Sequence, residues 1–216
     1  MHPLTELWPR VFTLLAQPGF DQRLAAWKDQ FWMRTGIPHP GETGYESRMH
    51  MFEEWVLLDL EAPRPLLGGL LQDGQLPEPD ASLAQALLVS QHGLFVLMAP
   101  WTRTARFRDL LSGADFRLDE QPPVAGLEPG QILQTRFFAH ENKVWAGLGR
   151  LVHPRGATEI IHRRVALLHA QGRTRLEILH LLSKLAWRSG HYPRHAPEAF
   201  YDFSHPLVQD IVADWK

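Results

Sequence analysis

One stretch of the chain, residues 94–152, is predicted to be β-structure, and helical patterns flank it on both sides. Within it, residues 131–139 and 144–152 are mainly apolar runs of strand length, joined by a short polar segment that is typical of a β-hairpin. Shorter alternating runs precede them, and residues 127–130 have the Pro and Gly spacing of a tight turn. The stretch therefore predicts about five short antiparallel strands.

Two glycines, Gly147 and Gly149, share one face of the second hairpin strand. A strand face without side chains indicates a bend, or the close approach of another backbone. Together with the short turns between strands, this pattern favours a small, strongly curved antiparallel sheet or a partly open barrel.

Helical periodicity accounts for most of the rest of the chain. A loop rich in Pro and Gly, residues 36–44, separates two of the N-terminal helices. The expected fold class is α+β, with a helical N-terminal region (1–93), a central antiparallel β region (94–152) and a helical C-terminal region (153–216) in one compact domain. The predicted helices are 6–17, 21–34, 45–60, 82–91, 158–170, 174–188 and a last one over 205–216, with a short helix at most over 66–72.

The composition excludes several classes of protein. The chain of 216 residues has no cysteine, so disulfides and thiolate metal sites are absent. No apolar run approaches the ~20 residues that a membrane helix needs. The N-terminus lacks the basic segment and apolar run of a signal peptide. We therefore expect a soluble cytoplasmic protein.

Charge is distributed unevenly along the chain. Residues 1–93 carry a net −6, residues 94–188 a net +6 and residues 189–216 a net −2. Twelve of the fourteen basic residues in the middle block are arginines, which suit bidentate recognition of phosphate or carboxylate. Either the acidic and basic parts pack against each other within one molecule, or the basic part contacts a partner.

Arginines alternate with aromatic residues on the predicted strands. We predict a basic sheet face that contacts an acidic protein partner, in a non-enzymatic binding or regulatory module. The alternative is a binder of single-stranded nucleic acid, in which aromatic rings stack on bases and arginines neutralise phosphates. The candidate residues of this face are Arg103, Arg106, Arg108, Arg117, Arg136, Arg150 and Trp145.

One helix pattern is suggestive of metal binding. Glu46, His50 and Glu53 fall on one face of the predicted helix 45–60, and such sets bind iron, manganese or zinc in helical bundles. A metal-dependent enzyme using them is a further alternative. No second helix carries a matching Glu and His, so we interpret the three as a solvated helix face and predict no metal.

No motif indicates a reaction. Phosphate-binding loops, dinucleotide fingerprints and nucleophile elbows are all missing from the sequence. We therefore predict no catalytic residue and no cofactor. The chain has twelve histidines, and those of the C-terminal segment, His191 among them, are assigned no role.

Four groups of residues carry a resemblance to known sequences: 52–55 with Leu58 and Asp59, 110–113 followed by 127–130, 153–155, and 184–188 with Tyr192 and Tyr201. Through them, residues 50–201 resemble an uncharacterised family of bacterial proteins of similar length. The resemblance implies no activity, because none is assigned to that family.

Overall fold

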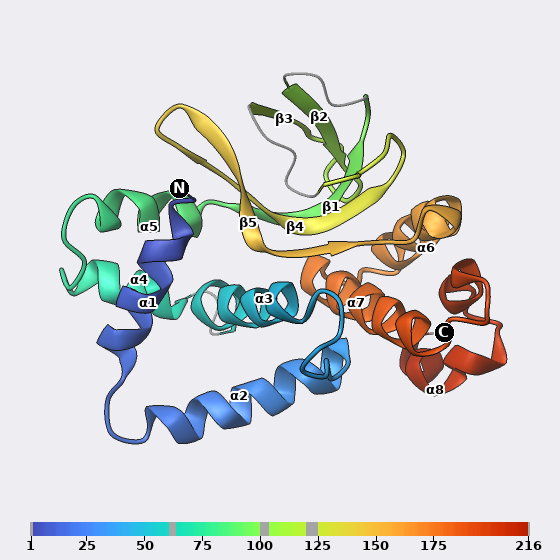
Figure 1. Cartoon of the computed structure of the whole chain (residues 1–216), viewed down its shortest axis with the longest axis horizontal. Coiled ribbons are helices and arrows are strands. Elements are labelled where there is room, and N and C mark those ends of the chain that lie inside the picture. Colours follow the sequence, from blue (N-terminus) through green and yellow to red (C-terminus); the bar gives the residue numbers. More distant parts are fainter. Residues whose placement is uncertain (1, 61–63, 100–103, 120–124, 216) are drawn as a thin grey trace.

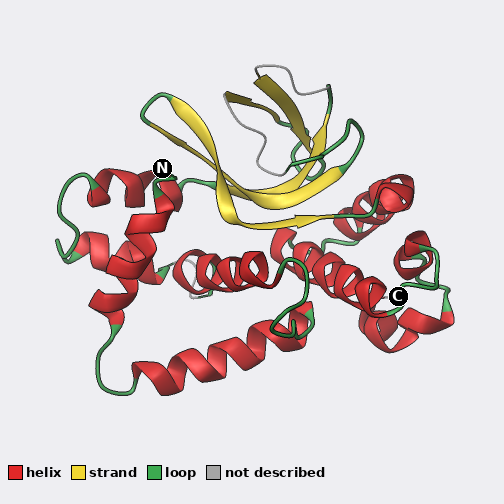
Figure 2. Ribbon diagram, in the orientation of Figure 1, coloured by secondary structure: helices red, strands yellow, loops and turns green. Residues whose placement is uncertain are grey.

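The computed structural model describes residues 2–60, 64–99, 104–119 and 125–215. It confirms the α+β fold class: helices from both ends of the chain flank a five-stranded antiparallel sheet. In Figure 1 the sheet lies above α3 and α7, with α1, α4 and α5 at one end and α6 at the other. Figure 2 shows the same separation of helix and strand by colour.

The N-terminal helices lie close to their predicted positions. Residues 66–72 form a two-turn helix, α4, where the sequence predicted a short helix at most. The helices are α1 (Leu4–Leu15), α2 (Phe20–Thr35), α3 (Tyr45–Leu58), α4 (Leu66–Gln72) and α5 (Asp80–Leu88).

The C-terminal region begins as predicted and ends differently. α6 (Thr158–Ala170) and α7 (Arg175–His191) form the expected pair, and Thr174 caps α7 in a reciprocal capping box with Glu177. The single helix predicted over 205–216 is interrupted at Val208, whose φ of −123° and ψ of 0° lie outside the α-helical range. The segment instead forms short turns: Pro206–Val208, α8 (Gln209–Val212) and Ala213–Trp215.

The five strands follow the order β3-β2-β1-β4-β5, and every pair is antiparallel. The sheet curls until its edge strands β3 and β5 contact each other, as expected for a partly open barrel. The strands are β1 (Gln91–Leu97), β2 (Thr104–Asp109), β3 (Asp115–Asp119), β4 (Ile132–His140) and β5 (Lys143–Val152).

Side-chain alternation on β1 divides the core into two layers. Phe95 points into the curled sheet, where it stacks on Phe137 with ring centroids 4.0 Å apart. Its neighbours Leu94 and Val96 point outward and pack on α6 and α7. Because both faces are covered, β1 is buried over most of its length, whereas β2 alternates between buried and exposed residues.

The two glycines of β5 permit a close approach, as the sequence indicated. α3 lies across β5, and a Cβ atom on Gly149 would lie 2.7 Å from backbone atoms of Met51. A Cβ on Gly147 would lie 2.5 Å from a carboxylate oxygen of Glu54. The helix backbone therefore contacts the strand directly at Gly149, whereas the space beside Gly147 is occupied by the Glu54 carboxylate. Within the described residues, no helix has both the length and the apolarity to cross a bilayer.

Gly149→Ala tests this contact. The new methyl group meets backbone that cannot rotate away, so α3 must shift from β5. We expect the free energy of unfolding in urea to fall by about 1–3 kcal/mol. Gly69→Ala is the control: nothing lies within 4 Å of its Cβ position in α4, and we expect it to be neutral or to stabilise by about 0.5–1 kcal/mol. An equal effect of the two substitutions would contradict the close contact.

Candidate functional site

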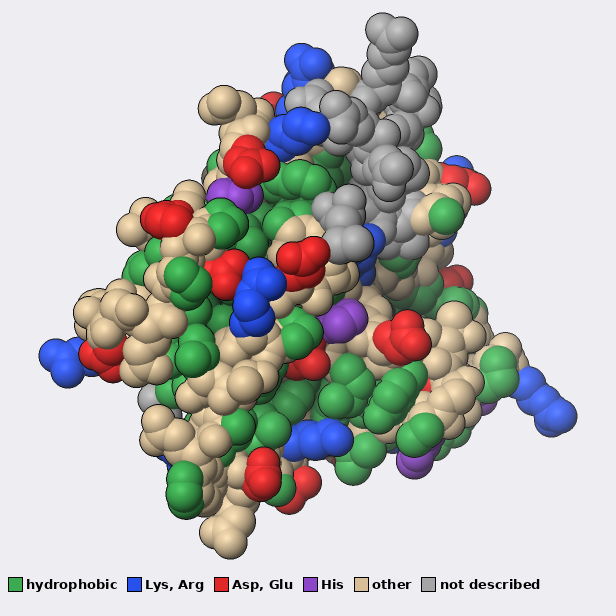
Figure 3. Space-filling model, turned by 60° about the vertical axis from the view of Figure 1, so that its left-hand side comes forward, with side chains coloured by type: hydrophobic (Ala, Val, Ile, Leu, Met, Phe, Trp, Pro, Cys, Tyr) green, Lys and Arg blue, Asp and Glu red, His purple; other side chains and the backbone are tan. Residues whose placement is uncertain are grey.

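The arginines of the predicted basic face do not form one surface. Arg106, Arg108 and Arg117 are exposed on the outer face of β2 and β3, where Arg106 pairs across the ladder with Arg117. Asp115 lies among them, with a carboxylate oxygen 2.8 Å from Nε of Arg108. Arg103 lies outside the described residues. On the face of the molecule in Figure 3, basic side chains are scattered among acidic ones.

Arg136 is buried in the middle of the molecule, with 4% of its surface exposed. Its Nη2 donates to Asp59 Oδ2 at 2.6 Å and its Nη1 donates to Ser90 Oγ at 3.0 Å. Asp59 directly follows α3, so an arginine of the basic part is neutralised by a carboxylate of the acidic part. At this position the intramolecular explanation of the charge asymmetry holds.

A second carboxylate, Glu54 of α3, completes this buried group. Glu54 Oε1 accepts the Gly149 N–H at 3.0 Å, and its Oε2 lies 4.0 Å from Nε of Arg136. Burial raises the pKa of Glu54 to about 7, against the attraction of Arg136. Although burial opposes it, Arg136 together with His92 lowers the pKa of Asp59 well below its ordinary value. Burial lowers the pKa of His92, which keeps that imidazole neutral.

A second network of buried, hydrogen-bonded side chains joins β4 to the C-terminal region. The Tyr201 hydroxyl donates to Nδ1 of His153 at 2.9 Å, and Nε2 of His153 lies 3.3 Å from Oε1 of Gln134. The Gln134 amide donates to Oγ of Ser183 at 2.9 Å. Burial lowers the pKa of His153 to about 3. All four side chains are buried and hydrogen-bonded, so we interpret this hydrogen-bond network as structural.

The other predicted candidates are held by local contacts. Trp145 is half-buried against the His2 ring, with centroids 5.5 Å apart. His50 Nδ1 lies 2.8 Å from Glu53 Oε2, and this hydrogen bond raises the pKa of His50. Glu46 is exposed. The three α3 residues are not brought together as a metal-ligand set within the described part of the chain.

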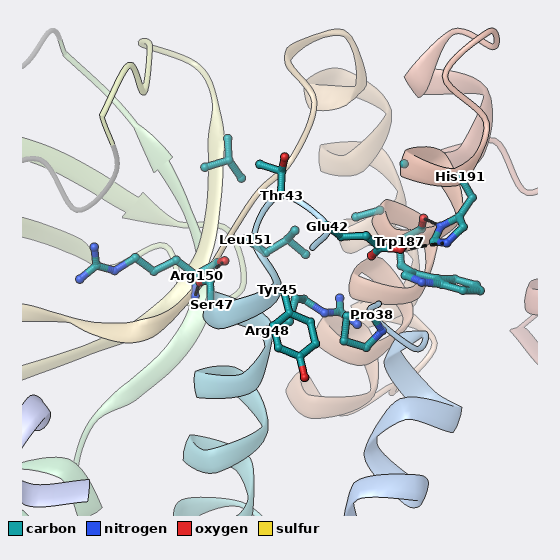
Figure 4. A pocket seen from close by; sticks show the side chains of 14 residues that line it. Pro38, Glu42, Thr43, Tyr45, Ser47, Arg48, Arg150, Leu151, Trp187 and His191 are labelled. Atoms are coloured by element: carbon teal, nitrogen blue, oxygen red, sulfur yellow. Dashed lines mark hydrogen bonds and ion pairs between the residues drawn. The ribbon is translucent and has the colours of Figure 1, made fainter. Parts of the chain in front are cut away.

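A pocket of ≈ 670 Å³ lies where the α2–α3 loop, the start of α3, the end of β5 and the end of α7 meet. Figure 4 shows it with Tyr45, Leu151 and Trp187 around the opening. Its lining comes from segments that are far apart in the sequence: Pro38, Glu42–Tyr45, Ser47, Arg48, Arg150–Val152, Ala186, Trp187, Gly190 and His191.

The loop that forms the pocket wall is anchored at several atoms. Gly36, at a φ of +87°, passes over the Trp187 ring so closely that a Cβ would lie 2.3 Å from it. The indole Nε1 donates to the Ile37 carbonyl at 2.7 Å. Nη2 of Arg48 donates to the carbonyls of Thr35 and Gly36 at 2.8 and 2.7 Å. α7 and α3 thus both fix the start of the loop.

Arg48 is a buried cation without a buried anion. It is 7% exposed, and among the described residues no carboxylate lies within ion-pair distance of its guanidinium. Its Nε is buried and makes no hydrogen bond there. Burial lowers the pKa of Arg48 to about 10, so it stays charged at neutral pH, and the negative charge of Glu42 opposes this shift. Its other contact is with the Trp32 ring, whose centroid is 5.6 Å away.

Arg150 also lines the pocket but is arranged differently. Its side-chain Nε donates to the Gly147 carbonyl at 2.7 Å, back along β5. In Figure 4 its guanidinium extends away from Arg48 and the other labelled side chains. Its backbone N–H donates to Oγ of Ser47 at 2.7 Å, which ties the start of α3 to the strand.

Three side chains gather at the edge of this pocket: His39 and Glu42 from the loop, and His191 from the end of α7. Glu42 and His191 also line the pocket. One ligand atom from each lies within 4.8 Å of the others. Nε2 of His191 is 3.3 Å from Oε1 of Glu42. Sequence reasoning missed this set, since the loop residues and His191 are about 150 positions apart. The one local signal was the rigid Pro- and Gly-rich loop.

Comparisons with protein-family models, with curated proteins and with solved structures gave no match. The resemblance to an uncharacterised bacterial family stays a prediction.

Glu54→Gln tests the buried group through its pH dependence. Between pH 4.5, the ordinary pKa of Glu54, and about 7, the folded protein keeps a proton that the unfolded chain releases. This carboxyl group therefore makes the free energy of unfolding fall as pH rises through that window. Relative to Glu54→Gln, the wild type should lose up to about 3 kcal/mol across it, measured by urea unfolding at a series of pH values. Glu46→Gln, which removes an exposed carboxylate of the same helix, controls for net charge. A constant difference between wild type and Glu54→Gln would contradict the raised pKa.

Proposed function

We propose that the protein binds a small organic anion in the pocket between the α2–α3 loop, β5 and α7, with Arg48 as the group that recognises the anion. The observation that carries this proposal is the buried, charged guanidinium of Arg48 on the pocket lining, which has no carboxylate partner among the described residues. Burying a cation costs several kcal/mol unless an anion compensates it, and the charge of Glu42 offsets only part of the effect of burial on Arg48. An anionic ligand would supply the counter-charge.

Part of the hydrogen-bonding capacity of Arg48 is not used within the described residues. A guanidinium has five N–H donors, and the three acceptors within the protein are all reached by Nη2. The bonds to the Thr35 and Gly36 carbonyls fix the plane of the group. A carboxylate or phosphate oxygen in the pocket would receive charge-assisted hydrogen bonds from a donor that is already oriented.

The remaining lining suits the organic part of a ligand. Trp187 and Tyr45 offer aromatic surfaces, while Pro38 and Leu151 are apolar. A concave site of a few hundred Å³ with apolar walls and few polar groups is typical of small-molecule binding. The combination favours a small molecule that carries an oxyanion and an apolar body.

Arg48→Gln is the direct test. The substitution removes the charge but keeps an amide donor toward the loop carbonyls. Loss of a charge-assisted hydrogen bond should weaken anion binding by about 1.5–3 kcal/mol, or about 10- to 150-fold. We would measure affinities for inorganic phosphate, acetate and succinate by calorimetry, with tag-free protein in the presence of a chelator.

Arg106→Gln is the matched control, since it removes an exposed arginine of β2 that does not line the pocket. We expect it to bind like the wild type. Arg48→Lys, which keeps the cation, should be intermediate and covers the case in which Arg48→Gln does not fold. Equal weakening by Arg48→Gln and Arg106→Gln, or no binding of any of the three anions to the wild type, would contradict the proposal.

Binding of an acidic protein partner stays a separate prediction. Among the described residues its arginine candidates are now Arg106, Arg108 and Arg117 on the outer face of β2 and β3, because Arg136 is buried and Arg150 lines the pocket, while Arg103 lies outside the described residues. Binding of single-stranded nucleic acid through this narrower face also stays a prediction.

A further inference from the structure

We infer that His39, Glu42 and His191 form a binding site for one divalent transition-metal ion, with Zn²⁺ as the best fit, beside the Arg48 pocket. Two imidazoles and one carboxylate are ligands that Zn²⁺ accepts readily, as in metalloenzyme sites with three protein ligands. The site goes beyond the proposed anion binding and does not require it, because the metal would bind in the absence of any anion.

The distances fit a metal with little rearrangement. In a tetrahedral zinc site with ligands at about 2.0–2.1 Å, neighbouring ligand atoms are ~3.4 Å apart. Nε2 of His191 and Oε1 of Glu42 already lie 3.3 Å apart. All three ligand atoms lie within 4.8 Å of one another, so an exposed side chain such as His39 needs to move by about one bond length at most.

The second ring nitrogen of His191 supports its role as a ligand. Nδ1 of His191 lies 2.9 Å from the Trp187 carbonyl, which can only accept a hydrogen bond. Nδ1 therefore carries the proton, and in the neutral imidazole the lone pair of Nε2 faces Glu42. A metal-binding histidine is commonly held in this way, with its other nitrogen donating to a carbonyl or carboxylate.

The backbone also positions the loop ligands. The Glu42 N–H donates to the His39 carbonyl at 3.0 Å, which places the two residues in one tight turn. Trp187 holds the start of the loop through the Ile37 carbonyl and, through its own carbonyl, orients His191. One residue thus fixes both sides of the site, and Figure 4 shows Glu42 and His191 directed toward each other next to it.

The competing explanation is a surface ion pair between a protonated His191 and Glu42. Such pairs contribute ~0–1 kcal/mol and require no third residue. That explanation gives no role to His39, whose ring centroid lies 6.1 Å from that of His191. Metal titration separates the two accounts.

Three protein ligands would leave a coordination position open. Since the cluster adjoins a pocket that also contains Arg48, a bound metal would place a second cation near any anion held there. This link depends on the proposed function, whereas the metal site does not.

The test uses the full-length, tag-free chain after removal of metal with EDTA and exchange into phosphate-free buffer. Co²⁺ titration is followed by the visible d–d absorption of the four- or five-coordinate ion, and Zn²⁺ affinity is obtained by competition. We expect one ion per chain. Glu42→Gln and His191→Ala should each weaken binding by about 100-fold or more.

Two matched controls should bind like the wild type. Glu46→Gln removes an exposed carboxylate near Glu42, and His169→Ala removes an exposed imidazole on α6. The inference would be overturned if His191→Ala and Glu42→Gln still bound one ion per chain. It would also be overturned if the wild type bound the metal no more tightly than Glu42→Gln does. Because zinc is titrated without phosphate and anions are titrated with a chelator, failure of one proposal is distinguishable from failure of the other.

Discussion

The structure depends on the contact between α3 and the β4–β5 hairpin. Gly147 and Gly149 leave no side chain between helix and strand, and Glu54 uses the resulting space to accept the Gly149 N–H. Arg136 extends from β4 and neutralises Asp59 just beyond the end of the helix. A buried ion pair of this kind adds little net stability, yet removing one partner leaves an unpaired charge in the interior. We infer that it fixes the position and register of α3 on the sheet.

The position of α3 determines where the pocket forms. The helix starts at the edge of β5, where the hydroxyl of Ser47 bonds with the backbone N–H and carbonyl of Arg150. Arg48, the next residue of the same helix, donates hydrogen bonds to the carbonyls of Thr35 and Gly36 at the start of the α2–α3 loop. α7 closes the other side through Trp187. The candidate site is thus a consequence of how the helical and β regions dock, and neither region contains it alone.

Much of the architecture was predictable from the sequence because it depends on local residue patterns. Periodicity located the main helices and strands, and the alternation of arginines with aromatic residues appears on β2, where Arg106 and Arg108 are exposed and Phe107 is buried. The paired glycines of β5 indicated a close backbone approach. These features depend on neighbours within a few residues, which is the range over which sequence patterns are informative.

The burial of Arg136 could not be predicted in the same way. β4 is buried on both faces from Ile132 to Phe138, so the alternation of side chains along the strand does not assign Arg136 to solvent. The guanidinium in that position is explained by Glu54 of α3 and by Asp59, which follows that helix. The cluster of His39, Glu42 and His191 is a similar case, because its members meet only after α7 packs beside the loop. The interruption of the C-terminal helix at Val208 is likewise not visible in the periodicity of the sequence.

A double-mutant cycle with Asp59→Asn and Arg136→Gln tests the central claim most directly. Urea unfolding of the two single variants and the double variant gives the coupling energy between these side chains. If the buried ion pair holds α3 on the sheet, each single substitution leaves the other residue as an unpaired buried charge. The coupling energy between the two residues should then be about 2–3 kcal/mol. Effects that add to within ~0.5 kcal/mol would show that the two side chains act independently and would contradict the account.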